Sequence, residues 1–288
     1  MTGDDAIWAI FDNGSTRDVV RIDPETNEME TVITVPTLPN PITAVGVGDF
    51  VWVASWDRSS VTQYDEQTGE EIDEHLVGTH PVEPIYAYGD IWTTAIHGNT
   101  VGRIDPETAD VQLLEMEPSG EPIGMTAVRD DRALIGNAGK APYVIDPQTM
   151  TVVGIFDPHV LSGCSPRIGA IEGELWMDNC TLDDPLVILD LDTGETLGQV
   201  DSPVTVDAPL FVDDLMWMPR EINNEHGHSD GQNWVGIDHD THELVAEYAA
   251  ASKFTEAGYA VGFDSLWMFG LEGILRIPAD TLREAVDQ

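Results

Sequence analysis

A short turn with the sequence Asp-Pro-Glu-Thr recurs along the chain at nearly regular intervals. Identical copies begin at Asp23 and Asp105. Related turns begin at Asp65, Asp146, Asp190 and Asp238, and a degenerate seventh begins at Pro278. Successive copies are 42, 40, 41, 44, 48 and 40 residues apart. A period of this length is typical of a repeat architecture in which each copy is one supersecondary unit.

The turn sequence itself has a physical basis. Proline suits the first corner of a type I turn because its φ angle is already set, and the Asp and Thr side chains can accept hydrogen bonds from the turn's own amides. A second landmark precedes each turn, a tryptophan in six copies and a leucine in one: Trp8, Trp52, Trp92, Leu134, Trp176, Trp217 and Trp267. Two independent markers therefore share one period, and we expect these large residues to pack between neighbouring units.

Each copy shows the pattern of four short β-strands. In the second copy, residues 41–49 alternate apolar and small side chains and residues 50–56 form an apolar run. After the turn, outward charges alternate with Ile72 and Leu76. These are strand patterns, whereas a helical repeat would need a 3.6-residue period that no long segment shows. Only residues 249–258 have the composition of one short helical turn.

Four strands in each unit of 40–48 residues predict an all-β fold, the seven-bladed β-propeller. The 288 residues suffice for one such domain. Its predicted blades span approximately residues 6–40, 41–83, 84–121, 122–165, 166–208, 209–257 and 258–288. Six inner strands are expected to begin near Ile42, Ile85, Gly124, Ile168, Leu210 and Tyr259. Blade one begins on a second strand, so we expect it to be three-stranded or to take its inner strand from upstream.

The charge of the chain disfavours two classes of partner. It has 12 basic and 53 acidic residues, a net charge of −41. Nucleic acids and anionic membranes are bound by basic patches, so neither is an expected partner. The acidity indicates either adaptation of the whole surface to high salt or an acidic secreted proteome, and cation binding at particular clusters is compatible with both. The sequence has no run of 18 apolar residues, so no transmembrane segment is predicted. Residues 1–5 lack the pattern of a signal peptide.

The two cysteines fall at the same end of two neighbouring strands. Cys164 precedes the inner strand of blade five, and Cys180 follows the next strand. Since these strands should form an antiparallel pair, we expect a Cys164–Cys180 disulfide, with two buried thiols as the alternative. A disulfide indicates an oxidising compartment, which predicts an extracellular, periplasmic or cell-surface protein.

The connections between blades are expected to converge at the mouth of the central channel. Most of them place a residue before proline at the entry of the inner strand, and in adjacent blades these residues are Glu83 and Glu121. Arg167 lies just inside a later blade and is a candidate ligand-binding residue. A ring of carboxylates can hold a hard cation such as Ca²⁺. The alternative is a solvated acidic funnel in an acidic protein.

Histidines and a tryptophan occupy loops on the same face. His97 lies between the second and third strands of blade three, and His80 lies in the connection that precedes Glu83. An imidazole beside a carboxylate can act as a general base or a metal ligand, although histidines are also common in surface loops. Trp56 and Arg58 lie in the corresponding loop of blade two, and they are candidate ligand-binding residues.

Blade six carries the one long insertion, residues 219–234. His226 and His228 are two residues apart, so they face the same way in an extended segment, and Asp230 follows them. Two imidazoles and a carboxylate can bind Zn²⁺. Arg220 opens the same segment as a candidate ligand-binding residue. The alternative is a mobile polar loop over the channel mouth.

Two stretches of the chain resemble known propeller families. Residues 51–85, VWVASWDRSSVTQYDEQTGEEIDEHLVGTHPVEPI, resemble the YVTN-type seven-bladed propellers, which have a strand, a variable loop, V-x-x-I-D-x-x-T-G, a strand and G-x-x-P. Residues 89–108, GDIWTTAIHGNTVGRIDPET, resemble the blades of streptogramin B lyases, where an aromatic-rich strand precedes N-x-I-G-R-I. The resemblance covers essentially the whole chain. It implies the propeller fold and, for the lyase family, elimination of a cyclic depsipeptide ester with Mg²⁺, His and Glu on the channel face.

Three functions follow as hypotheses. The first is a secreted or cell-surface binding propeller, a monomer that takes a small molecule or peptide at the channel mouth and is stabilised by a cation. The second is a lyase or hydrolase that uses a divalent ion (Ca²⁺, Mg²⁺ or Zn²⁺) and no organic cofactor, with His97 or His228 as the catalytic candidates and His226 beside them. A scaffold for protein partners is the third. No nucleophile elbow, phosphate loop or dinucleotide fingerprint supports other chemistry.

Overall fold

The strands of the protein form seven antiparallel sheets, one for each predicted repeat, so the fold is a seven-bladed β-propeller. The computed structural model describes residues 3, 5–37, 41–116, 121–129, 131–137, 141–155, 168–177, 185–200, 210–212, 215–223, 229–249, 259–270 and 273–284. Two compact units make up the chain, Met1–Phe156 and Asp157–Gln288. Each unit is described by itself below.

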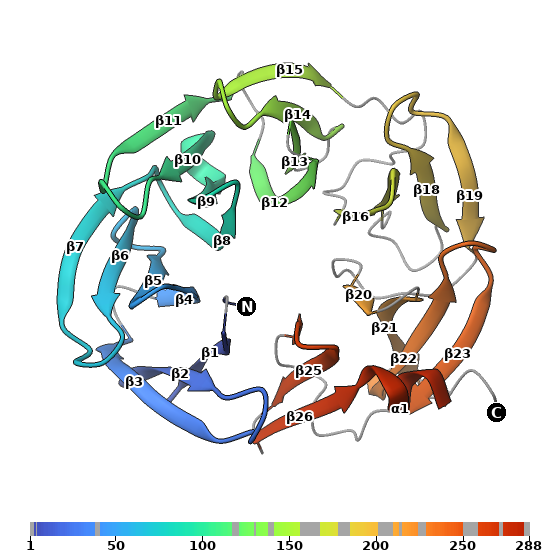
Figure 1. The fold of residues 1–288 in the computed structure, drawn as a ribbon, viewed down its shortest axis with the longest axis horizontal. Helices are drawn as coiled ribbons and strands as arrows, with labels where there is room; N and C mark the ends of the chain where they lie inside the picture. The colour runs from blue at the N-terminus through green and yellow to red at the C-terminus, as the bar shows by residue number, and fades with distance from the viewer. Residues whose placement is uncertain are drawn as a thin grey trace. The chain divides into compact units, whose positions relative to one another are not determined.

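The first unit holds four sheets whose strands follow one another in sequence order. Figure 1 shows β4, β8 and β12 on the inner side of this unit and β7, β11 and β15 on its outer side. The elements are β1 (Ile7–Asp12), β2 (Thr16–Ile22), β3 (Met29–Pro36), β4 (Pro41–Val47), β5 (Phe50–Ser55), β6 (Ser60–Asp65), β7 (Glu71–Leu76), β8 (Pro81–Ala87), β9 (Asp90–Ala95), the 3₁₀ helix η1 (Ile96–Gly98), β10 (Thr100–Ile104), β11 (Val111–Glu115), β12 (Pro122–Arg129), β13 (Arg132–Asn137), β14 (Tyr143–Asp146) and β15 (Thr151–Ile155).

The second unit holds three sheets of the same kind. Its elements are β16 (Ile168–Ile171), β17 (Glu174–Met177), β18 (Leu186–Asp190), β19 (Thr196–Val200), β20 (Leu210–Val212), β21 (Leu215–Asn223), β22 (Ser229–Asp238), β23 (Leu244–Ala249), β24 (Tyr259–Val261), β25 (Ser265–Gly270), β26 (Gly273–Pro278) and the helix α1 (Ala279–Glu284). In the described part of the chain no helix is long and apolar enough to cross a membrane.

The first and last blades depart from the four-stranded pattern. In the described part of blade one, β1, β2 and β3 form a three-stranded sheet, which is one of the two arrangements that the sequence left open. Blade seven also has three strands among its described residues, and α1 follows where blades two to six have a fourth strand. The degenerate turn at Pro278 leads into this helix, whose Ala279 and Leu282 are buried in the apolar cluster of blades six and seven. Pro278 stands where the other copies have Asp, so this copy lacks the carboxylate that accepts hydrogen bonds from the turn amides.

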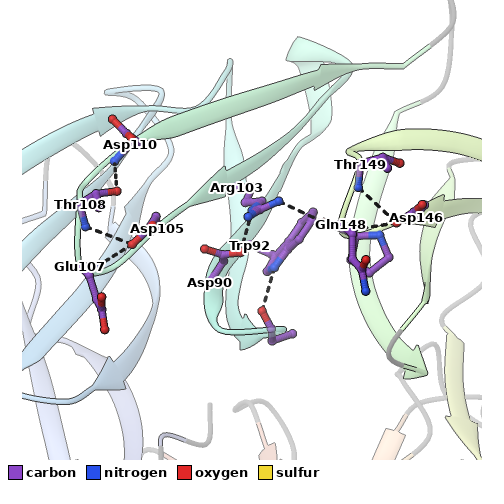
Figure 2. Close-up of polar contacts among 12 residues, drawn as sticks. Asp90, Trp92, Arg103, Asp105, Glu107, Thr108, Asp110, Asp146, Gln148 and Thr149 are labelled. Carbon is purple, nitrogen blue, oxygen red and sulfur yellow. Dashed lines mark hydrogen bonds and ion pairs between the residues drawn. The ribbon is translucent and has the colours of Figure 1, made fainter.

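The recurring turns form as expected. Asp105 accepts hydrogen bonds from the amides of Glu107 (2.8 Å) and Thr108 (3.0 Å), and Asp146 does the same for Gln148 and Thr149 (Figure 2). These backbone amide donors hold the pKa of each turn carboxyl below its ordinary value, because they stabilise the charged form. The turn is therefore a local structure that needs no tertiary contact.

The repeated tryptophans lie in the core, between blades. Trp92 is fully buried and packs against β13 and β14 of the next blade. Its indole Nε1 donates to the Ala87 carbonyl (2.9 Å), and the Arg103 guanidinium lies 5.7 Å from the ring centre. Arg103 also pairs with Asp90 (2.6 Å) and donates to the Pro147 carbonyl of blade four (3.1 Å), a bridge that Figure 2 shows. The cross-strand pair of Trp92 and Arg103 thus joins blade three to blade four, Trp92 by packing and Arg103 by a hydrogen bond.

His75 is a buried imidazole on the otherwise exposed strand β7, and it makes stability depend on pH. It packs against Trp52 with ring centres 5.4 Å apart, and its Nε2 has no hydrogen-bond partner. Burial lowers the pKa of His75 from its ordinary value of 6.5. The unfolded chain therefore binds the proton more tightly, and stability is lost as the pH falls from 6.5 through the folded-state pKa.

We expect the urea midpoint of the wild type to fall relative to that of His75→Leu between about pH 7.5 and about pH 5, because the variant lacks this imidazole. Urea titrations of both proteins across this range measure the difference, which cancels the contribution of the other histidines. A wild type and variant with parallel pH profiles would contradict the prediction.

Candidate functional site

Three connections of the first unit meet where blade two joins blade three. Trp56 lies in the loop between β5 and β6, His80 lies in the connection from β7 to β8, and His97 lies on η1 between β9 and β10. The sequence grouped His80 and His97 with Glu83, and it assigned Trp56 to a loop of the same face. The structure brings all three side chains into contact, and we call them the ring cluster.

The ring cluster has a defined geometry. The rings of Trp56 and His80 are stacked, with centres 4.4 Å apart and an interplanar angle of 11°. His97 stands edge-on to both: its ring centre lies 4.6 Å from that of His80 at 70° and 6.0 Å from that of Trp56 at 76°. The Nδ1 atoms of His80 and His97 face one another in hydrogen-bond contact. The two polar edges therefore meet on a stacked aromatic surface.

Backbone hydrogen bonds hold the two sides of the connection that carries His80. The Val77 amide donates to the Ser59 carbonyl in the loop of Trp56, and the Ile96 amide donates to the His80 carbonyl, each at 3.1 Å. His80 itself has a φ angle of 59°, in the left-handed region. A Cβ on Gly98 would lie 2.7 Å from the Thr79 nitrogen, so the connection runs directly against η1. The ring cluster thus lies on backbone that is restrained by hydrogen bonds, so ligand binding costs less conformational entropy.

Trp56 differs from every other tryptophan in the protein. The other seven are all buried, with exposed fractions of 0–1 %. Trp56 is partly exposed, and His97 is exposed beside it. Its position is explained by the ring cluster and not by the core, since it belongs to none of the apolar clusters described.

Arg58, two residues from Trp56, is turned toward the outer strand of its own blade. Its guanidinium pairs with Glu71 (3.6 Å) and Glu74 (3.7 Å), and Glu74 also accepts a hydrogen bond from the Ser60 hydroxyl. The positive charge nearest in sequence to the ring cluster is therefore already matched by two carboxylates. This arrangement leaves the cluster better suited to a cation than to an anion.

The two carboxylates expected at the channel mouth lie in the same unit. Glu83 has a φ of 46° at a register shift in β8, and its Oε2 would lie 2.8 Å from a Cβ on Gly124. Glycine at 124 therefore makes room for this carboxylate, while the Gly124 amide donates to Thr94 (3.0 Å). Glu121 is exposed. Across the described ranges, no group of three or more His, Cys, Asp or Glu side chains is arranged to hold a metal ion.

Several sequence candidates lie outside the described residues. They are Cys164, Arg167, Cys180, His226 and His228, together with the side chains of Arg220 and Asp230. The backbone around the last two corrects one expectation. Residues 219–223 pair with 229–234 as extensions of β21 and β22, so the insertion lengthens a hairpin where a long loop was predicted. Pairing satisfies backbone amides and carbonyls that an irregular loop would leave to water.

The second unit contains a polar cluster that sequence reasoning missed. Glu174 accepts hydrogen bonds from Trp176 Nε1 (2.9 Å) and lies 3.0 Å from His242 Nε2, and His239 Nε2 is 3.5 Å from its other oxygen. The three charged or titratable side chains are 13–18 % exposed, and they join blades five and six. A signal was present in the sequence. His242 occupies the turn position where other copies have Gly69 or Gly194, and its φ is 58°.

Comparison with known proteins supports the fold and does not indicate an activity. No protein-family model matches the sequence, and no curated protein sequence is similar to it. Among solved structures, a chain of Kuenenia stuttgartiensis hydrazine synthase has a TM-score of 0.69 at 14 % identity, covering 84 % of this chain and 76 % of that one. A chain of the mitotic checkpoint complex has a TM-score of 0.68 at 11 % identity, covering 91 % and 84 %. The computationally designed Ika8 protein has a TM-score of 0.59 at 13 % identity, covering 96 % and 98 %.

Proposed function

We propose that the protein is a ligand-binding β-propeller whose site is the ring cluster of Trp56, His80 and His97, and whose ligand is a small cation. The observation that carries the proposal is the convergence of three ring side chains from three separate connections. Trp56 is the one tryptophan of the chain that is not placed in the core. Ligand sites generally combine aromatic surface with a few convergent polar groups.

The charge of the protein supports a cationic ligand. A net charge of −41 attracts cations toward the surface. Aromatic faces bind cations through the ring quadrupole. Arg58 is held by Glu71 and Glu74, so no cation of the Trp56 loop competes for the ring surface. The proposal includes an extracellular or cell-surface setting, which rests on the expected Cys164–Cys180 disulfide.

The test uses 1-methylnicotinamide, a planar organic cation that quenches indole fluorescence. Because seven tryptophans are buried, the difference between the wild type and Trp56→Phe isolates the signal of Trp56. We expect the difference signal to saturate with concentration. Neutral nicotinamide and anionic nicotinate serve as matched probes, and both should quench more weakly. An aromatic–cation contact is worth about 0.5–2 kcal/mol, so Trp56→Ala should weaken binding by about 2- to 30-fold when followed through the NMR signals of the probe.

Saturation of the quenching distinguishes binding of the probe from collisional quenching. An acidic surface concentrates any cation near an exposed indole, which steepens quenching without a site, but that effect remains linear in concentration. The control variant is His80→Asn, since asparagine tolerates the left-handed φ at this position. Linear quenching by all three probes, with the same slope in His80→Asn, would refute the proposed site.

A further inference from the structure

We infer that the ring cluster also binds one late first-row transition-metal ion, Cu²⁺ above all, between Nδ1 of His80 and Nδ1 of His97. The inference rests on the proposed function for the location of the site. It goes beyond that proposal because it names a metal ion and the two atoms that hold it. The observation behind it is that these two nitrogens face each other directly.

A metal ion can replace the hydrogen bond between the two Nδ1 atoms. A hydrogen bond between two imidazoles needs one donor and one acceptor, so one Nδ1 carries a proton and the other a lone pair. A metal ion takes a lone pair from each ring. The proton on the first Nδ1 then moves through solvent to Nε2 of the same ring, so both imidazoles stay neutral and charge is balanced. Metal–nitrogen bonds are about 2.0–2.1 Å long, so one ion can bind both nitrogens in place of the shared proton. His97 is exposed, which allows its ring to move.

The donor set selects the ion. Imidazole nitrogen suits Cu²⁺, Ni²⁺ and Zn²⁺, and Cu²⁺ binds such ligands most strongly of the three. Ca²⁺ and Mg²⁺ require oxygen ligands and are not expected here. In the described ranges no third ligand side chain is grouped with the pair. The remaining coordination positions therefore fall to water or to a small molecule that brings its own donors, which makes a chelated metal a ligand class for this surface.

Trp56 provides the readout. Its ring is stacked on that of His80 with centres 4.4 Å apart, so an ion on Nδ1 of His80 lies beside the indole. Cu²⁺ quenches indole fluorescence at such short range. We expect Trp56→Phe to remove most of the quenching while leaving the stoichiometry unchanged. The histidine variants, which keep the indole, separate this site from nonspecific binding to surface carboxylates.

The experiment titrates untagged, EDTA-treated protein with Cu²⁺ in about 1 M KCl, where screening suppresses binding to surface carboxylates. Fluorescence and calorimetry are followed together. His226→Ala with His228→Ala forms the background, because those imidazoles can also bind Cu²⁺. Loss of even a partner of a metal ligand typically costs 10–100-fold in affinity, so His80→Asn and His97→Asn should each weaken binding at least about tenfold. His239→Asn, which changes another partly buried imidazole, should leave binding unchanged.

One ion per chain, lost in both ring-cluster variants, supports the inference. Unchanged affinity in His80→Asn and His97→Asn overturns it, and so does equal quenching by Mg²⁺. The two proposals fail separately. Saturable binding of 1-methylnicotinamide without Cu²⁺ binding removes the metal site alone. Cu²⁺ binding that needs both histidines, without saturable binding of the organic cation, keeps the metal site and removes the organic-cation ligand.

Discussion

Replacing Gly46 by alanine is expected to lower the free energy of unfolding by about 3 kcal/mol, the upper end of the usual cost of overpacking. Gly46 lies in β4 and pairs with Val51 in β5. A Cβ at this position would lie 2.2 Å from Nε1 of Trp8, 2.5 Å from its Cε2 and 2.7 Å from its Cζ2. Trp8 is 1 % exposed, so the indole of blade one has no space into which it can move.

The matched control is Gly154→Ala, at a strand glycine of β15 in the same unit. There the nearest neighbour of a new Cβ is the Val144 side chain at 3.9 Å, an ordinary contact. Glycine within a strand costs about 0.5–1 kcal/mol relative to alanine, so this change should be neutral or slightly stabilising. Urea midpoints and melting temperatures measure both variants. Equal effects of the two changes would contradict the packing explanation. Trp8→Phe should partly rescue Gly46→Ala, since coupled neighbours give non-additive effects.

Salt is expected to change stability more than any surface substitution. With 53 acidic and 12 basic residues, the folded chain gathers like charges that the unfolded chain separates. The Debye length falls from about 10 Å at 0.1 M salt to about 3 Å at 1 M, so added KCl screens this repulsion. If screening recovers about 3 kcal/mol, the melting temperature rises by about 6–12 °C, at about 2–4 °C per kcal/mol.

The control for salt separates screening from solvent exclusion. Sucrose stabilises folded proteins because it is excluded from their surface, and it carries no charge. We expect KCl and choline chloride to raise the melting temperature by similar amounts at equal ionic strength, with most of the rise below about 1 M. A melting temperature that does not respond to KCl, or that responds equally to sucrose, would remove adaptation to salt as the reason for the acidity.

Much of the architecture was accessible from the sequence because its causes are local. Each Asp of the recurring turns bonds amides two and three residues ahead, as Asp105 does with Glu107 and Thr108. Such contacts depend on a few consecutive residues. They recur at the repeat period, so the blade count and the place of most inner strands followed from spacing alone. The same spacing showed that blade one begins on a second strand, and it left open a three-stranded blade or an inner strand from upstream.

Two details of the fold were not accessible. Residues 219–234 have the composition of a loop, yet the described parts extend β21 and β22, because a neighbouring strand satisfies their backbone groups. At the C-terminus, α1 takes the place of a fourth strand and buries Leu282 against the core of blades six and seven. A short helix at the last blade depends on the surface that it meets, which local propensity does not describe.

The sequence by itself determined the repeat, the turns, the buried tryptophans and the high negative charge, since each arises from neighbouring residues or from composition. Only the tertiary structure decided which side chains meet. Trp56, His80 and His97 come from three connections, and the hydrogen bond from Ile96 to His80 sets their approach. Arg58 was a candidate of the same loop but turns to Glu71 and Glu74. Contacts between distant segments depend on backbone direction and register, and a one-dimensional pattern specifies neither.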